Sequence, residues 1–298
     1  MAEAERHVLV TGGAGQIGTE LKRLIWPEDV VVHSPDRSVL DLSDAAAVAR
    51  AFQATPYSLV INTAAYTAVD KAEDDVAGVF AANAVAPALL ADQCRRSGAG
   101  LIQVSTDYVF NGEGDRPYEE GDPTSPLGVY GASKLAGELA VLSGNPKTVV
   151  LRTAWVFSPH RANFVKTMLR VGLQHSQIRV VADQHGCPTS AKDIAAAILV
   201  VATRLMDDPD APTGIYHFVN DGAATWHEFA QAIFDTYGME LSPDVVAIET
   251  KDYPTPAKRP KNSRLANGGL LRDFGVTPRD WRLALADTIA EIKKGREP

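Results

Sequence analysis

A glycine-rich turn near the N-terminus constrains the fold of this chain more than any other stretch of its sequence. The turn, residues 11–18, follows a short β-rich run at 7–10 and precedes a segment with apolar residues at helical spacing as far as Ile25. Glycines here allow a tight turn and let the backbone approach a pyrophosphate at the helix N-terminus. They fit both the G-x-G-x-x-G and the G-x-x-G-x-x-G spacing. The predicted dinucleotide site includes Gly12, Gly15, Gln16, Ile17 and Gly18.

Strand-like and helix-like segments alternate through the first half of the chain. The stretch 58–62 is almost wholly apolar, which is typical of a parallel strand buried on both faces. Further strands are predicted at residues 29–33, 100–104 and 147–151, with helices at residues 43–52 and across residues 79–90. This order predicts an α/β fold, a Rossmann-type doubly wound parallel sheet with helices on both faces.

The second half of the chain has a different pattern. Helices are predicted at residues 162–173, 192–205, 225–237 and 281–294, and strands at residues 178–182 and 214–219. The helix at 192–205 has no polar face over several residues, so we expect it to lie buried against the sheet. We assign residues 1–157 and the returning helix 190–206 to the dinucleotide-binding domain. Residues 158–189 and 207–298 would form a smaller C-terminal α/β substrate-binding domain.

The end of the second strand predicts which nicotinamide cofactor is bound. NAD-binding chains usually place an acid here for the ribose 2′-hydroxyl. This chain offers Ser34 and Arg37 instead, and an arginine suits a 2′-phosphate. Asp36 is near enough in sequence to reach the ribose, so NADPH is favoured and NADH stays open. Asp41, beside Leu42, is suited to accept from the adenine amino group or to act as an acid at a helix N-terminus.

Small and polar residues follow two further strands. Ala64, Ala65 and Tyr66 come just after the strand at 58–62, where small side chains leave room for a cofactor at the carboxyl edge of a parallel sheet. Thr106 and Asp107 follow the strand at 100–104 and face the same edge. The sequence therefore predicts one crevice lined by both segments.

Tyr130 and Lys134 lie four residues apart in a predicted helix. Residues at this spacing share one helix face, with about 5–6 Å between their Cβ atoms. The ammonium favours the phenolate and lowers the tyrosine pKa from about 10, which gives an acid for proton transfer to a substrate oxygen. Most such pairs are surface contacts, so this pair indicates a catalytic site only in combination with the glycine turn and the polar strand ends.

Together these features resemble the extended short-chain dehydrogenase/reductase superfamily. Four segments narrow the resemblance to the dTDP-4-dehydrorhamnose reductase family: residues 65–73, 105–110, 152–157 and 253–265. The resemblance covers nearly the whole chain. It implies NAD(P)H-dependent reduction of the C4 ketone of dTDP-4-dehydro-L-rhamnose to dTDP-L-rhamnose. Two alternatives stay open: a reductase giving the C4 epimer, a 6-deoxy-talose sugar, and a non-catalytic regulatory subunit related to that of methionine adenosyltransferase.

The resemblance also implies roles for single residues. Tyr130 would protonate the carbonyl oxygen, while Lys134 would lower the pKa of that tyrosine and hydrogen-bond the nicotinamide ribose. Thr106 would polarise the carbonyl as a neutral donor. Asp107 would hold a sugar hydroxyl or else cap its strand end, and Trp155 would line the sugar pocket.

A basic, proline-rich loop near the C-terminus is the last candidate for substrate binding. It holds the one dense positive cluster in a chain of net charge −8, at Lys258, Arg259, Lys261 and Arg264. The resemblance favours contact with the dTDP diphosphate over a solvated loop, and the planar arginine fork suits phosphate. The further substrate contacts implied are Val69, Lys258, Arg259 and Asn262.

Composition limits the partners and the location that we expect. The net charge of −8 argues against general nucleic-acid binding, and the two cysteines, Cys94 and Cys187, predict neither a disulfide framework nor a metal site. Residues 1–6 lack a signal-peptide core, and the apolar run 194–202 is too short to span a bilayer. We therefore expect a cytoplasmic protein without membrane contact whose partner is a small-molecule dTDP-sugar. A homodimer stays open.

In some members of the family that this chain resembles, magnesium bridges the two subunits of a dimer through acidic side chains. Glu20 is suited to be one ligand, but the helix after residue 189 offers Lys192 beside Asp193 where another acid is expected. We therefore predict no metal site.

Overall fold

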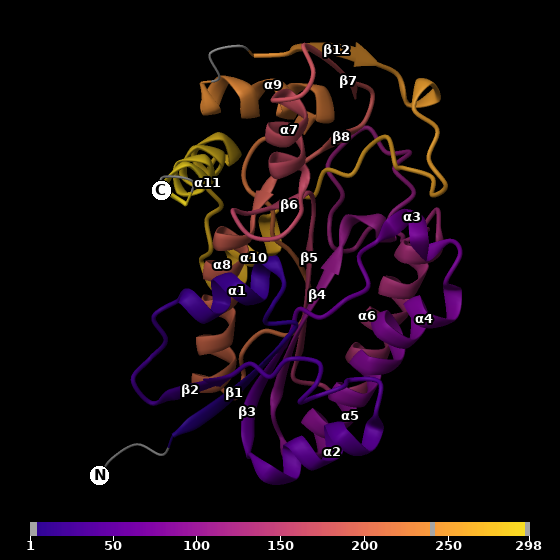
Figure 1. The fold of residues 1–298 in the computed structure, drawn as a ribbon. Coiled ribbons are helices and arrows are strands. Elements are labelled where there is room, and N and C mark those ends of the chain that lie inside the picture. Colours follow the sequence, from indigo (N-terminus) through magenta and orange to yellow (C-terminus); the bar gives the residue numbers. More distant parts are fainter. Residues whose placement is uncertain (1–4, 239–241, 296–298) are drawn as a thin grey trace.

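The computed structural model describes residues 5–238 and 242–295 (Figure 1). Residues 1–4 of the polar N-terminal stretch lie outside this part of the chain. At the centre is a six-stranded sheet in the order β10-β5-β4-β3-β1-β2, with every neighbouring pair parallel. Its strands are β1 (Arg6–Thr11), β2 (Val30–His33), β3 (Tyr57–Asn62), β4 (Gly100–Thr106), β5 (Thr148–Thr153) and β10 (Gly214–His217).

Helices cover both faces of this sheet, which confirms the predicted doubly wound α/β fold. One face carries α1 (Gln16–Arg23), α8 (Ala191–Asp207) and α10 (Gly268–Phe274). The other carries α2 (Ala45–Ala54), α5 (Ala86–Ser97) and α6 (Val129–Gly144). The burial expected for the helix at 192–205 is confirmed, because Ile194, Ile198 and Val201 of α8 are inaccessible to solvent and pack beside Val8 and Val10.

A second hydrophobic core lies beyond the carboxyl edge of the sheet, at the top of Figure 1. It joins α7 (Phe164–Gly172), α9 (Trp226–Tyr237) and α11 (Trp281–Lys294) to the parallel pair β7 (Gln177–Val181) and β12 (Asp244–Ile248). Phe229 and Trp281 are both fully buried there and meet edge to face at 5.5 Å. Two short pairs connect this part to the sheet: β6 (Val156–Phe157) with β9 (Thr189–Ser190), and β8 (His185–Gly186) with β11 (Ala224–Thr225).

Two predicted boundaries need correction. The helix after the glycine turn ends at Arg23, and Ile25, expected on its apolar face, is 93% exposed. Pro27 accounts for this early end, because a proline disfavours helical conformation in the residue before it. β4 runs on to Thr106, beyond the predicted end at residue 104. β10 pairs with β5 as the sixth strand of the sheet, although its residues fall in the range predicted for the substrate domain.

One continuous helical run, Val76–Ser97, is long and apolar enough by length and composition to cross a membrane. It comprises α4 (Val76–Phe80), the π-helical segment η1 (Ala81–Val85) and α5. Its inner side contacts α6 and the sheet, with Leu90, Ala91 and Cys94 wholly buried. A helix that packs on a sheet needs this apolar side, so its composition alone is weak support for a membrane span.

A buried ion pair fixes α6 to the neighbouring strand β5. Nε and Nη2 of Arg152 donate to the carboxylate of Glu138 at 3.0 and 2.7 Å, and both side chains are almost inaccessible to solvent. The guanidinium also lies 5.1 Å from the centre of the Phe110 ring. Removing one partner of such a pair leaves an unpaired charge in a medium of low polarity.

We therefore expect Glu138→Gln to lower the free energy of unfolding by about 3–5 kcal/mol. Chemical denaturation measures this loss. Asp92→Asn is the matched control, since Asp92 pairs with Arg96 at 2.8 Å on an exposed helix surface, and exposed pairs contribute about 0–1 kcal/mol. Equal losses in the two variants would contradict the role given to the buried pair.

Candidate active site

The glycine turn lies at the point where the strand order reverses, between β1 and β3. Gly12 has a φ of +71°, and a Cβ added there would come within 2.6 Å of the backbone N of Ala64. A Cβ on Gly18 would lie 2.4 Å from the carbonyl oxygen of Gly12. The turn therefore needs glycine at both positions and places the backbone beside residues 63–64, as the sequence predicts for a cofactor crevice.

The N-terminus of α1 remains open toward this crevice. The N–H of Gly15 donates to the carbonyl of Gly12 at 2.8 Å, and no side chain caps the helix. Ile17 is buried in the core beneath the helix, so it offers the crevice only its backbone. The side-chain oxygen of Gln16 accepts from Ser158 at 2.8 Å and from Asn163 at 2.9 Å, so this side chain binds to the other part of the chain. Free N–H groups at a helix N-terminus suit a pyrophosphate.

The residues predicted for the adenosine end follow β2. The Ser34 hydroxyl is buried without a hydrogen-bond partner in the described chain, and a Cβ on Gly13 would collide with it. The Asp36 carboxylate accepts from the N–H and hydroxyl of Ser38, so it is occupied within its own loop. Arg37 is 85% exposed, with Nε 3.9 Å from a carboxylate oxygen of Asp41. This arrangement favours a phosphate over a ribose hydroxyl as the group that this loop receives.

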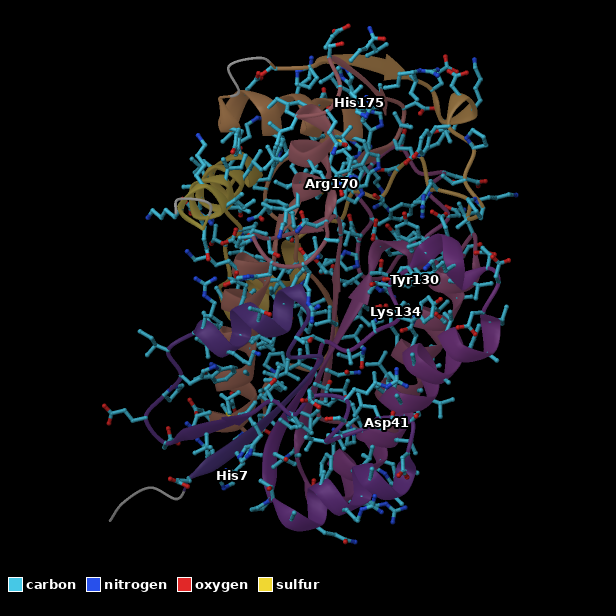
Figure 2. All side chains as sticks on the ribbon, viewed as in Figure 1. His7, Asp41, Tyr130, Lys134, Arg170 and His175 are labelled. Carbon is cyan, nitrogen blue, oxygen red and sulfur yellow. The ribbon has the colours of Figure 1, made fainter. Side chains whose placement is uncertain are left out.

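Asp41 and Leu42 lie between β2 and α2. The Asp41 carboxylate accepts from the N–H of Ser43 at 3.0 Å, and Asp44, not Asp41, caps α2. Leu42 is partly buried against the core on that face. Figure 2 shows Asp41 near the α2 side of the molecule, well below the tyrosine–lysine pair.

Tyr130 and Lys134 lie in the first turns of α6, at the carboxyl end of β4 (Figure 2). Lys134 is buried, and its Nζ donates to the carbonyl oxygen of Val104 at 2.7 Å. An ammonium group has three donors, and the other two have no hydrogen-bond partner in the described chain. Burial lowers the Lys134 pKa to about 8, although the charge of Glu138 acts in the opposite direction.

The predicted depression of the Tyr130 pKa is wrong for this arrangement. Burial raises the pKa of the half-buried phenol, and the nearby charges of Asp107 and Tyr108 add to the increase. The Thr106 hydroxyl acts in the opposite direction. Lys134, whose ammonium donates to the Val104 carbonyl, is not among the groups that lower the Tyr130 pKa here. Tyr130 therefore keeps its proton at neutral pH.

Thr106 and Asp107 form a buried polar pair at the end of β4. The Thr106 hydroxyl donates to Oδ1 of Asp107 at 2.9 Å and accepts from the N–H of Tyr108 at 3.2 Å. Oδ2 of Asp107 has no hydrogen bond of normal geometry in the described chain, although Ser263 is near enough to lower its pKa. Burial dominates and raises the Asp107 pKa to about 6.

Asn83 is a structural residue of this site that sequence reasoning missed. It lies buried in η1, where its amide accepts from the N–H of Tyr66 at 2.8 Å and donates to the hydroxyl of Ser133 at 3.0 Å. It thus holds the segment of Ala64, Ala65 and Tyr66 against α6. It lies in a π-helical turn, and such turns are frequent at functional sites, but no pattern in the sequence marks this turn.

Trp155 packs against the second core. Its φ is +46°, which is rare for a residue with a side chain, and its ring stacks on Trp226 at 3.4 Å between centroids. A Cβ on Gly186 would lie 2.3 Å from the same indole. A strained backbone held by close packing is typical of functional sites. Here it holds a half-buried indole against Gly186 and Trp226.

Some of the predicted substrate-binding residues in the basic loop are already bound within the chain. Arg259 pairs with Asp70 at 2.8 Å, one residue after Val69 at the start of α3 (Val69–Ala72), and Lys258 is exposed. The buried Asn262 amide donates to two backbone carbonyls in the loop at 111–116 and accepts from Arg264. This full set of bonds favours a bracing role for Asn262 over a substrate contact.

The acidic residues considered for magnesium are occupied by cations. Glu20 is buried, accepts from Nε2 of His160 at 2.9 Å and lies 3.6 Å from Arg23. Asp193 pairs with Arg279 at 2.9 Å. Within residues 5–238 and 242–295, no group of three or more metal-ligating side chains is found.

The fold and the site define a Rossmann-type member of the short-chain dehydrogenase/reductase class. The model of the family described as "RmlD substrate binding domain" matches residues 6–294. The chain therefore belongs to this family.

Named relatives agree with this membership. The chain is 43% identical over 280 residues to a dTDP-4-dehydrorhamnose reductase of Sinorhizobium fredii, covering 92% of this chain and 94% of that protein. A crystal structure of a dTDP-4-dehydrorhamnose reductase from Clostridium acetobutylicum is similar with a TM-score of 0.91 and 37% identity, covering 96% and 99% of the two chains. A Bacillus anthracis reductase of the same name, solved with NADP, has a TM-score of 0.89 and 34% identity, covering 96% and 99%.

We expect Gly12→Ala to weaken NADPH binding about tenfold or more, because a side chain at this left-handed position costs about 1–2 kcal/mol and also displaces the backbone of residues 63–64. Fluorescence titration with NADPH measures the affinity. Gly98→Ala is the matched control: its φ is +77°, but no atom lies within 4 Å of the added Cβ. Equal affinity in the two variants would show that the turn does not hold the cofactor.

Proposed function

We propose that this chain reduces the C4 ketone of dTDP-4-dehydro-L-rhamnose to dTDP-L-rhamnose with NADPH. The observation that carries the proposal is the cluster of Tyr130, Lys134 and Thr106, which lies at the same strand edge as the glycine turn. Membership of the family and the names of the relatives at 36–43% identity support the substrate. The NADP in the Bacillus anthracis relative supports the cofactor.

The residues present fit a nicotinamide dinucleotide phosphate. The uncapped N-terminus of α1 would hold the pyrophosphate, and Ser34 with Arg37 would hold the 2′-phosphate. The two remaining donors of Lys134 would hold the nicotinamide ribose. When bound, the cofactor supplies the hydride for carbon C4.

The chain itself supplies the proton and the electrostatic support for this reduction. Tyr130 is protonated at neutral pH and is the proton donor to the carbonyl oxygen. The Thr106 hydroxyl, whose one proton is donated to Asp107 in this structure, would turn to donate to the developing oxyanion, and Lys134 would hold the nicotinamide ribose. Asp107, with one free carboxylate oxygen, is suited to hold a sugar hydroxyl. Trp155 would form one wall of the sugar pocket.

Several finer features are also proposals. The nucleotide part would comprise residues 1–157 and 190–206, with β10 added, and the remainder would bind the sugar. Arg259 would receive the diphosphate, with Lys258 next to it in the sequence. Val69, which precedes Asp70 at the start of α3, would be a further substrate contact. We also propose a cytoplasmic location, and a homodimer stays open. An assay of the product distinguishes dTDP-L-rhamnose from its C4 epimer. The complete set of Tyr130, Lys134 and Thr106 argues against a purely regulatory subunit.

The test is NADPH oxidation with dTDP-4-dehydro-L-rhamnose, with Tyr130→Phe as the decisive variant. We expect turnover to fall about 10²- to 10⁴-fold in this variant, because the acid is lost, while NADPH affinity changes little. NMR of the product, through the coupling at C4, distinguishes the rhamnose from the talose sugar.

Two results would contradict the proposal. One is wild-type turnover in Tyr130→Phe. The other is the absence of NADPH oxidation by the wild-type chain with a panel of dTDP-keto-sugars, which would favour the regulatory alternative. Running NADH in parallel tests the cofactor preference.

The pH dependence of kcat/KM should be bell-shaped. The rate should rise through pH about 6 as Asp107 ionises, and fall above pH about 8 as Lys134 loses its proton. Asp107→Asn should remove the acid limb, and Lys134→Arg should move the alkaline limb upward, since an arginine stays protonated. A profile that is flat across both pKa values would contradict these roles.

A further inference from the structure

We propose that Asp70 is a positioning residue for the substrate: its carboxylate holds Arg259 and the loop 253–264 in the arrangement that receives a nucleoside diphosphate. The inference rests on the proposed function, because it takes Arg259 as the contact for that anion. It starts from one ion pair between segments 189 residues apart, in which Nη2 of Arg259 lies 2.8 Å from Oδ2 of Asp70.

The second oxygen of the same carboxylate holds the loop backbone. Oδ1 of Asp70 accepts from the N–H of Ala257 at 3.3 Å. The Ala257 side chain is buried, and its carbonyl accepts from the Thr255 hydroxyl at 2.7 Å. One carboxylate on α3 therefore fixes both the backbone of the loop and the direction of its arginine. At 20% and 41% exposure, the Arg259 and Asp70 side chains are partly shielded from solvent screening.

Arg259 remains able to bind an anion while it is held. Its Nη1 lies 3.4 Å from the Tyr108 hydroxyl, which is a long hydrogen bond. A guanidinium has five N–H donors, and those not directed to Asp70 or Tyr108 have no hydrogen-bond partner in the described chain. A tethered arginine with free donors is preorganised, so less side-chain entropy is lost when it binds a phosphate.

The other cations of the loop are placed differently. Lys258 and Lys261 are exposed, while the guanidinium of Arg264 is bound to the carbonyl of Asp115 and to the side chain of Asn262. Among the cations of this loop, Arg259 is the one that an acidic side chain, that of Asp70, holds beside Tyr108.

The ion pair also connects to the proposed proton donor. The ring of Tyr108, whose hydroxyl is near Arg259, meets the ring of Tyr130 edge to face at 5.5 Å. A substrate that binds Arg259 with its diphosphate and Tyr130 with its ketone would lie beside Tyr108, which contacts both residues. Asp70 therefore sets where Arg259 holds the diphosphate, while Tyr130 receives the ketone.

The experiment is a double-mutant cycle of Asp70→Asn and Arg259→Gln. We expect Asp70→Asn to raise KM for the dTDP-keto-sugar, and Kd for dTDP measured by calorimetry, about tenfold, with kcat and the KM for NADPH within about twofold of wild type. In the Arg259→Gln background the same change should add less than about twofold, because Asp70 acts through Arg259. Asp70→Glu, which restores the charge, should recover part of the affinity.

Asp122→Asn is the matched control, because Asp122 pairs with Arg116 at 2.7 Å on a neighbouring loop. This variant should leave both constants unchanged. An unchanged or lower Kd for dTDP in Asp70→Asn, or an effect that adds fully to that of Arg259→Gln, overturns the inference. Weaker dTDP binding in Asp70→Asn, with no turnover in the wild type, would instead support the inference and overturn the proposed reduction.

Discussion

The site depends on how closely α6 lies against its neighbours. A Cβ on Gly131 would lie 2.2 Å from a carbonyl oxygen of the turn after β4, and one on Gly137 would lie 2.1 Å from a carbonyl oxygen of η1. Larger residues cannot replace these glycines without moving the helix. The ion pair of Glu138 with Arg152 then holds the same helix on β5. This packing brings Tyr130 to the edge of the sheet where the parallel strands end.

The sequence predicts those features that depend on local spacing. The glycine turn, the apolar run of β3 and the pair Tyr130–Lys134 are each contained within a few residues, so periodicity and residue type identify them. Contacts between distant segments cannot be predicted in this way. Gln16 binds Asn163 across 147 positions, and no pattern in either segment marks the contact. The same reason explains why the partner of Arg259 was not found by sequence reasoning.

The direction of the Tyr130 pKa shows a second limit of sequence reasoning. Spacing alone predicts an ammonium beside a phenol, and therefore a lower pKa. The structure adds burial of the phenol and the nearby charge of Asp107, and these reverse the direction. A phenol that keeps its proton is still a competent donor, because the alkoxide formed from a ketone is a stronger base than a phenolate. Lys134 then contributes by holding the nicotinamide ribose with its two remaining donors.

Two bridges join the parts of the chain on either side of the crevice. On the cofactor turn, Gln16 binds Ser158 and Asn163. On the sugar side, Asp70 binds Arg259. Both bridges are contacts of the folded chain itself, so folding meets the entropic cost of bringing the two parts together. A substrate that binds this preformed site loses less freedom at the interface, and more of its binding energy remains to orient the ketone for reaction.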